Sequence, residues 1–159
     1  MTSRTLAEQT GITIRLRRHF SAVRERVFRA WTDAELLKQW WCPSGWTPAE
    51  IEINLWPGGT YRIGMRRVGG GVPAFVNGVF LEVSLPEKLV YTWSWENAFP
   101  GMPETRVTVE FLEREGGTEI VLIHENLPEI PICLRHREGW LVAWDRIEQS
   151  LSLPVNSHD

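Results

Sequence analysis

The sequence predicts an α+β domain in which a curved antiparallel sheet of about six to seven strands wraps around one long C-terminal helix. Three observations predict it. Apolar and polar residues alternate in short segments over most of residues 12–124, brief turns join these segments, and helical spacing begins near residue 132. Short connections favour antiparallel neighbours, and the apolar face of such a sheet needs a cover. Only the last helix is long enough to provide that cover.

The N-terminal part of the pattern predicts one strand followed by two short helices. Residues Ile12–Phe20 alternate as a half-buried strand does. Ser21 is a plausible N-cap for a helix over Val23–Trp31, whose apolar residues share one face. Asp33 can cap a second short helix over Ala34–Trp41. We expect these two helices to close one end of the sheet.

Six further alternating segments predict the rest of the sheet: residues 50–55, 61–66, 75–83, 89–95, 106–111 and 118–124. Glycine pairs or triplets interrupt the pattern at residues 58–59, 69–71 and 116–117, where turns are expected. The segment Ile132–Leu153 then places its large apolar residues on one narrow stripe, which predicts an amphipathic helix of about 30 Å. Pro154 ends it.

Composition bounds the organisation and the partners. The chain has 159 residues, 43% of them hydrophobic, and a formal net charge of −3. We expect a single domain over residues 11–153, with flexible ends at residues 1–10 and 154–159. No long basic run, secretory signal or membrane-length apolar run is present, so the sequence predicts a cytoplasmic protein that binds neither nucleic acid nor membrane. Cys42 and Cys133 are expected to be reduced thiols.

Nine Trp residues are many for a chain of this length. Several lie on the inward phase of the predicted strands or on the apolar stripe of the last helix, so the sequence predicts an apolar, Trp-lined pocket between sheet and helix. The candidate ligand-binding residues are Trp41, Trp56, Tyr61, Met65, Tyr91, Trp93, Trp95, Val109, His124, Trp140 and Trp144. Trp31, Trp40 and Trp46 are expected to pack the helix pair. The same rings could also fill the space and leave a solid core.

Catalytic and metal motifs are not evident. The histidines lack the close spacing of a metal site, and no Gly-x-Ser-x-Gly elbow is present, so the sequence predicts no catalytic residue, no metal and no cofactor. His124 is the one histidine expected to point inward, because it lies in phase with Ile120 and Leu122. It is either a hydrogen-bonded structural histidine or a polar anchor for a ligand.

Five stretches in order carry a family resemblance over roughly residues 12–152: SAVRERVFRAWTDAELLKQWWCP, INLWPGGTYRI, GVFLEVSLPEKLVYTWSWE, TRVTVEFLEREGGTEIVLIHENL and HREGWLVAWDRIEQSL. The chain resembles the START-like (SRPBCC, birch-pollen-allergen-like) superfamily. Within it, the chain is similar to bacterial proteins named after the C-terminal domain of the activator of the heat-shock-protein-90 ATPase. The resemblance implies a helix-grip fold with a hydrophobic cavity. Cys42 departs from the pattern, because relatives usually carry Gly there.

The resemblance does not define an activity, since this superfamily includes carriers, cyclases, aromatases and chaperone activators. The leading hypothesis is non-covalent binding of a small hydrophobic or aromatic molecule by a monomer or homodimer. One alternative is an enzyme of the polyketide cyclase, aromatase or hydrolase type in the same cavity, with His124 as the first candidate acid or base. The other is a stress-response interaction module that regulates a chaperone ATPase.

Overall fold

A computed structural model describes residues 11–152 of the chain. The flexible ends predicted for residues 1–10 and 154–159 lie outside the described residues. The elements in chain order are β1 (Ile12–Phe20), α2 (Arg24–Thr32), α3 (Ala34–Leu37), β2 (Trp46–Ile53), β3 (Thr60–Arg67), β4 (Ala74–Ser84), β5 (Lys88–Trp95), β6 (Thr105–Arg114), β7 (Gly117–Leu127) and α4 (Ile130–Ser152).

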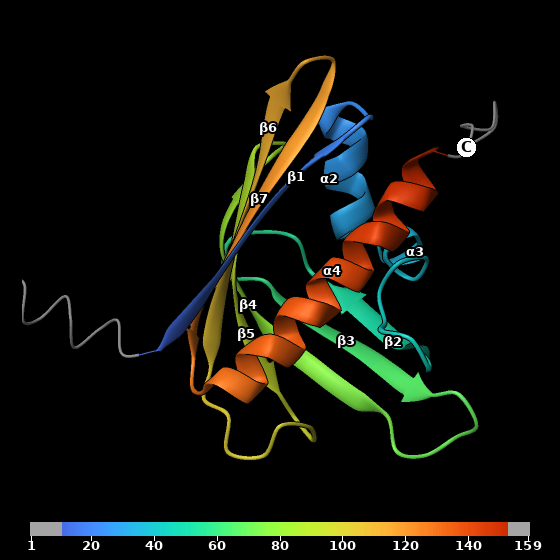
Figure 1. Cartoon of the computed structure of the whole chain (residues 1–159), viewed down its shortest axis with the longest axis vertical. Helices are drawn as coiled ribbons and strands as arrows, with labels where there is room; N and C mark the ends of the chain where they lie inside the picture. The colour runs from blue at the N-terminus through green and yellow to red at the C-terminus, as the bar shows by residue number, and fades with distance from the viewer. Residues whose placement is uncertain (1–10, 153–159) are drawn as a thin grey trace, which may run out of the picture.

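The strands form one seven-stranded sheet in the order β1-β7-β6-β5-β4-β3-β2, and every neighbouring pair is antiparallel. The sheet curves around α4, which runs diagonally across its concave side (Figure 1). The predicted α+β helix-grip fold is therefore confirmed. Within residues 11–152, no helix is long and apolar enough to cross a membrane.

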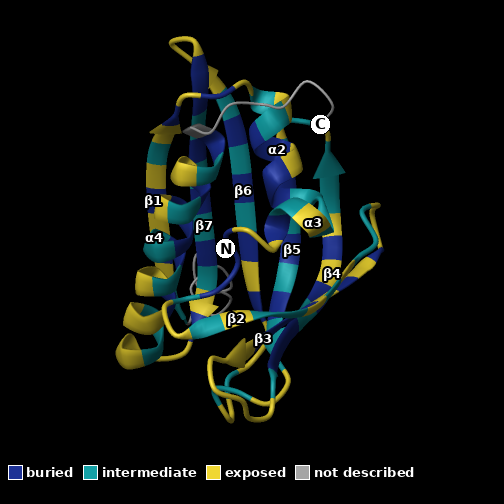
Figure 2. Ribbon diagram, turned by 90° about the vertical axis from the view of Figure 1, so that its right-hand side faces the viewer, coloured by how far each residue is buried: buried dark blue, intermediate teal, exposed yellow. Residues whose placement is uncertain are grey.

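Burial follows this arrangement. Buried residues concentrate where the sheet faces α2 and α4, whereas the hairpin turns and the outer side of α4 are exposed (Figure 2). Trp140, Trp144 and Ile147 bring the predicted apolar stripe of α4 into the core, each at most 5% exposed. On the outer side, Arg18 of β1 donates to Asp145 and Glu148 of α4 over 2.9 and 3.2 Å.

Two helix boundaries differ from the sequence prediction. Val23, not Ser21, occupies the N-cap position of α2, and its side chain makes no capping bond. The chain is still tied to the sheet before that point, because the Thr118 hydroxyl donates to the carbonyl of Ala22. The predicted Asp33 cap is confirmed, since its carboxylate accepts the backbone N–H groups of Glu35 and Leu36. However, α3 ends at Leu37, and turns carry the chain on to Trp41.

Cys42 follows these turns in a strained backbone conformation. Its φ is 143°, in a region that glycine adopts at little cost and other residues rarely adopt. The strain has a structural use, because the redirected Cys42 carbonyl accepts a hydrogen bond from Arg146 of α4. Ser150 of α4 also donates to Gln39, over 3.0 Å. The segment after α3 is thus fastened to the C-terminal half of α4.

This strain leads to a prediction about Cys42. We expect Cys42→Gly to be more stable than Cys42→Ala by about 1–2 kcal/mol, because both variants lose the thiol but only Gly relieves the backbone. Urea unfolding of the two variants measures the difference. An equal or reversed order would show that the backbone at this position carries no penalty.

Candidate ligand cavity

A cavity lies where α2, α3 and the turns after α3 face strands β2 to β5. Its volume is about 30 Å³. A buried water needs roughly 10–15 Å³, so this space suits about two or three waters. The lining residues are Trp31, Leu37, Trp40, Trp41, Ile53, Tyr61, Ile63, Phe80, Leu89, Tyr91, Trp93 and Trp140.

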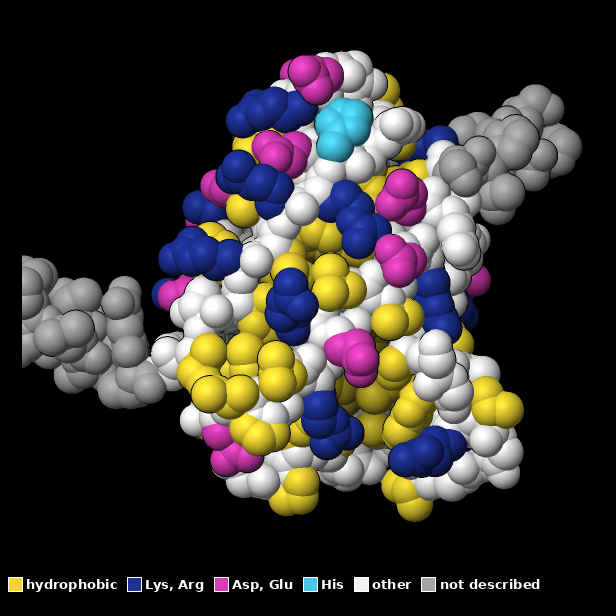
Figure 3. All heavy atoms as spheres, in the orientation of Figure 1, with side chains coloured by type: hydrophobic (Ala, Val, Ile, Leu, Met, Phe, Trp, Pro, Cys, Tyr) yellow, Lys and Arg dark blue, Asp and Glu magenta, His cyan; other side chains and the backbone are white. Residues whose placement is uncertain are grey.

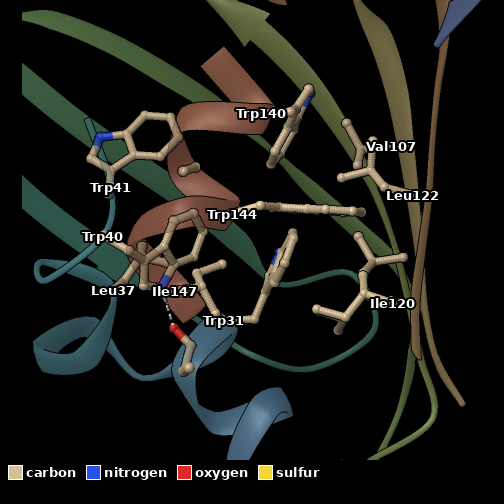
Figure 4. Packing of buried hydrophobic residues seen from close by; sticks show 14 of the residues in the cluster. Trp31, Leu37, Trp40, Trp41, Val107, Ile120, Leu122, Trp140, Trp144 and Ile147 are labelled. Atoms are coloured by element: carbon tan, nitrogen blue, oxygen red, sulfur yellow. Dashed lines mark hydrogen bonds between the residues drawn. The ribbon is translucent and has the colours of Figure 1, made fainter. Parts of the chain in front are cut away.

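The wall is held together by aromatic contacts among elements far apart in sequence. Trp31 of α2 lies nearly parallel to Trp140 of α4, with ring centroids 6.0 Å apart and an interplanar angle of 15°. Trp40 packs against Trp31 at 5.2 Å. Trp93 of β5 contacts Trp140 at 5.4 Å and Trp41 at 5.9 Å. Figure 4 shows Trp31, Trp40, Trp41 and Trp140 grouped in this way, with Ile120 and Leu122 of β7 across the core.

Five of the predicted site residues lie on this wall: Trp41, Tyr61, Tyr91, Trp93 and Trp140. The strand alternation identified the residues of β3 and β5, because side chains two apart share a face. Trp31 and Trp40 do pack against each other as expected, but they also line the cavity, which the sequence pattern did not predict. The missed aliphatic residues are Leu37, Ile53, Ile63 and Leu89, together with Phe80. Their alternation marked them as inward without showing which inward residues border a cavity.

The other six predicted residues do not line the cavity. Trp56 is 58% exposed because it lies in the turn between β2 and β3. Trp144 faces the opposite half of the core, where its ring meets Phe20 at 5.8 Å. Trp95 lies at the end of β5 and bonds to His136 over 3.0 Å. Met65, Val109 and His124 are buried in the core without contributing to the wall.

His124 lies behind the wall and is bonded at both ring nitrogens. Its Nδ1 accepts the indole N–H of Trp140 over 3.2 Å, so Nε2 carries the proton and donates to the Thr105 hydroxyl over 2.8 Å. Thr105 in turn donates to the carbonyl of Trp93. This chain of bonds holds the Trp140 ring of the wall through its indole N–H and the backbone of Trp93 through its carbonyl. Neither ring nitrogen of His124 is therefore free to bind a ligand, which fits a hydrogen-bonded structural histidine.

His136 makes a second arrangement of the same kind. Its Nε2 accepts from Trp95, and its Nδ1 donates to the carbonyl of Ile132 over 2.9 Å. Burial lowers the pKa of His136 and lowers that of His124 well below its usual value. The two rings lie 5.5 Å apart, so a charge on His136 would lower the pKa of His124 further. Both histidines are therefore neutral at pH 7, which their roles as acceptors require.

These depressed pKa values predict that the protein loses stability in mild acid. The pKa of a histidine in the unfolded chain is about 6.5. Below that pH the unfolded chain binds protons at these two histidines and the folded protein does not, so the free energy of unfolding falls as pH falls. The slope is at most about 1.4 kcal/mol per pH unit for each histidine. Urea unfolding at pH 7.5, 6.5 and 5.5 measures it. In His136→Gln, whose amide can still accept from Trp95, the slope should be smaller. Constant stability over this range would contradict the assignment.

Tyr61 closes the cavity on its β4 side. Its ring crosses β4 at Gly78, and its hydroxyl donates to the carbonyl of Thr92 on β5. The regular ladder is interrupted here, because Val79 donates its backbone N–H to the Thr92 hydroxyl over 2.8 Å. Burial raises the pKa of Tyr61 well above its usual value. Tyr61 is thus a neutral donor that joins two strands while its ring forms part of the wall.

Some polar groups of the wall have hydrogen-bond partners and others do not. Among residues 11–152, three buried indole N–H groups have no hydrogen-bond partner, and two of them, those of Trp41 and Trp93, belong to the wall. The third belongs to Trp144. The Tyr91 hydroxyl accepts from Trp31 over 3.2 Å, and it donates to no residue within the described part of the chain. Each unpaired buried donor costs about 1–3 kcal/mol, which makes these groups notable.

Other kinds of site lack support in the same region. Within residues 11–152, no group of three or more His, Cys, Asp or Glu residues is placed to hold a metal ion. Both cysteines are free thiols, and burial raises the pKa of Cys42 to about 12, which keeps it protonated and unreactive. The geometry defines a helix-grip protein with a small, aromatic-walled cavity.

Comparison with known proteins gives the family. The family described as "Activator of Hsp90 ATPase homolog 1-like protein" matches residues 21–152, and the chain belongs to it. No curated protein matched the sequence. This family membership confirms the resemblance found in the sequence.

Solved bacterial structures support the same conclusion. A crystal structure from Chromobacterium violaceum is similar at 25% identity and a TM-score of 0.80, covering 90% of this chain and 99% of its own. The AHSA1 protein from Silicibacter pomeroyi is similar at 26% identity and a TM-score of 0.78, and the match covers 89% of this chain and 98% of the other. A solution structure from Arthrobacter aurescens shares the fold, with 22% identity and a TM-score of 0.78, and the match covers 92% of this chain and 90% of the other.

Proposed function

We propose that this protein binds a small hydrophobic molecule, without covalent chemistry, in the Trp-lined cavity beside α3. The observation that carries the proposal is the wall itself: its twelve side chains are apolar or aromatic, and none carries a formal charge. Ligand sites of this type are concave and mainly apolar, with few polar groups. The proposal assigns ligand contact to Trp31, Trp40, Trp41, Tyr61, Tyr91, Trp93 and Trp140. It also places the protein in the cytoplasm as a monomer or homodimer.

A ligand larger than water requires the wall to move, because the cavity of about 30 Å³ is nearly filled. The point of entry that fits best is β2. This strand lies at the edge of the sheet, and Ile53 on it is the one lining residue that is only partly buried. The opposite side is less free to move, because Arg146 and Ser150 fasten the segment after α3 to α4. We therefore expect β2 and the neighbouring wall to open for the ligand.

The chaperone activity in the family's description is not carried over to this chain, since membership of a family and a fold does not define an activity. The enzymatic alternative depends on His124, and both nitrogens of that ring are bonded away from the cavity. A general acid or base must lie within hydrogen-bond reach of its substrate. Non-covalent binding is therefore the function that the geometry supports best.

A pair of cavity variants tests the proposal with indane, a small bicyclic hydrocarbon. Leu89→Ala enlarges the cavity, whereas Leu122→Ala makes the same chemical change in the core, away from the wall. Both variants should lose about 2–5 kcal/mol of stability. We expect indane to raise the melting temperature of the wild type, to raise that of Leu89→Ala more, and to give Leu122→Ala no gain over the wild type. If neither indane nor its ketone 1-indanone raises the melting temperature of the wild type or of Leu89→Ala, the proposal is wrong.

A further inference from the structure

We infer that the preferred ligand is a neutral, flat aromatic molecule that carries a carbonyl or similar hydrogen-bond acceptor and no donor. This inference rests on the proposed function and specifies its ligand class. It comes from the unused polar groups of the wall, which are donors. An indole N–H can only donate, so Trp41 and Trp93 each need an acceptor from elsewhere.

The two unpaired indoles are close neighbours. Their rings meet edge to face at 5.9 Å and an interplanar angle of 69°, and both border the cavity. Trp41 is 9% exposed and Trp93 is 4% exposed, so bulk water does not solvate these N–H groups. An acceptor atom brought in by a ligand would replace a missing partner at a site where an unpaired donor is costly.

Tyr91 adds a third donor to the same wall. Its hydroxyl oxygen accepts from Trp31, which leaves its hydrogen available, and burial raises the pKa of the phenol so that it keeps that hydrogen. The remaining indoles of the wall are already paired: Trp31 bonds to Tyr91, Trp40 to the carbonyl of Ala30, and Trp140 to His124. The free capacity of the wall is therefore mainly donating capacity.

The same wall excludes other ligand classes. A charged ligand would have to leave water without meeting an opposite charge, since no lining side chain is ionised. A ligand with N–H or O–H groups would set its donors against the unpaired indoles. Flat rings match the aromatic walls formed by Trp31, Trp93 and Trp140. These three requirements together define the neutral aromatic acceptor.

Three bicyclic probes of nearly equal size separate the contributions. 1-Indanone carries a carbonyl, indane replaces it with a methylene group, and indole carries an N–H donor. We expect isothermal titration calorimetry to show that 1-indanone binds about tenfold more tightly than indane or indole, the difference expected for one good hydrogen bond to a buried donor. Equal affinities for 1-indanone and indane would overturn the inference while leaving the binding function in place. If none of the three binds, the proposed function fails and the inference fails with it.

Matched Trp→Phe variants locate the effect. In Trp41→Phe/Trp93→Phe, each position keeps a smaller aromatic ring but loses its N–H, so the preference for 1-indanone over indane should fall to about twofold or less. Trp144→Phe removes an equally unpaired and buried N–H that does not border the cavity, so the tenfold preference should persist. The single variants Trp41→Phe and Trp93→Phe give the same test if the double variant fails to fold. A preference that survives the loss of both N–H groups would overturn the assignment.

Discussion

Gly78→Ala should destabilise the protein by about 2–4 kcal/mol, although it adds only one methyl group. A Cβ at this position would lie 2.0 Å from the backbone oxygen of Thr92 and 2.7 Å from Cε2 of Tyr61. The first of these atoms belongs to the neighbouring strand, so the backbone must move. The second belongs to the ring that closes the cavity. The Tyr61 hydrogen bond to Thr92 should therefore be lost together with the local strand pairing.

Gly139→Ala is the matched control for this change. Gly139 lies inside α4, and a Cβ there meets nothing within 4 Å. Because Gly is a poor helix residue, the substitution should stabilise the protein by about 0.5–1 kcal/mol. Urea unfolding of both variants measures the contrast. If Gly78→Ala is as stable as Gly139→Ala, the close crossing of Tyr61, Gly78 and Thr92 is not as the structure has it.

His124→Ala should cost about 3–5 kcal/mol. The ring is fully buried, so its removal leaves a void. The Trp140 N–H also loses its acceptor, and the Thr105 hydroxyl loses the hydrogen bond that it accepts from His124. The cost thus combines lost packing with an unpaired buried donor.

His124→Phe separates these two costs. It keeps an aromatic ring of similar shape but cannot accept from Trp140, so we expect a loss of about 1–3 kcal/mol. His19→Ala is the matched histidine control, because His19 is exposed on β1 and its ring makes one bond, to the carbonyl of Arg114 over 2.9 Å, so it should lose at most about 1.5 kcal/mol. Chemical unfolding at pH 7.5 gives all three values. His124→Ala with the stability of His19→Ala would contradict the structural role assigned to His124.

The sequence was sufficient to predict the architecture because its signals are local. Strand alternation, glycine turns and the change to helical spacing near residue 132 are each read within a few residues. The Asp33 cap is local in the same sense and was predicted correctly. Ser21 was predicted as a cap for the same reason, but Val23 holds the N-cap position, and the Thr118 hydroxyl of β7 bonds to the carbonyl of Ala22 before it. That contact spans 96 positions, so no local pattern reveals it.

The cavity was only partly predictable, because alternation shows which way a side chain points and not what it meets. It placed Tyr91 and Trp93 inward, and both lie on the wall. It also placed His124 inward, yet its partners Thr105 and Trp140 lie 19 and 16 positions away. Trp56 followed an alternating segment but falls in its turn, where it is exposed. The volume left between the rings depends on their three-dimensional packing, which periodicity does not encode.

The indole N–H signals in a ¹H–¹⁵N NMR spectrum report directly whether a small aromatic acceptor enters the Trp-lined cavity. The chain has nine Trp residues, and Trp→Phe variants assign their signals. On addition of 1-indanone, the signals of Trp41 and Trp93 should move downfield as their N–H groups gain an acceptor, whereas those of Trp56 and Trp144 should stay in place. A shift confined to Trp56, or no shift at saturating 1-indanone, would show that the ligand does not enter this cavity.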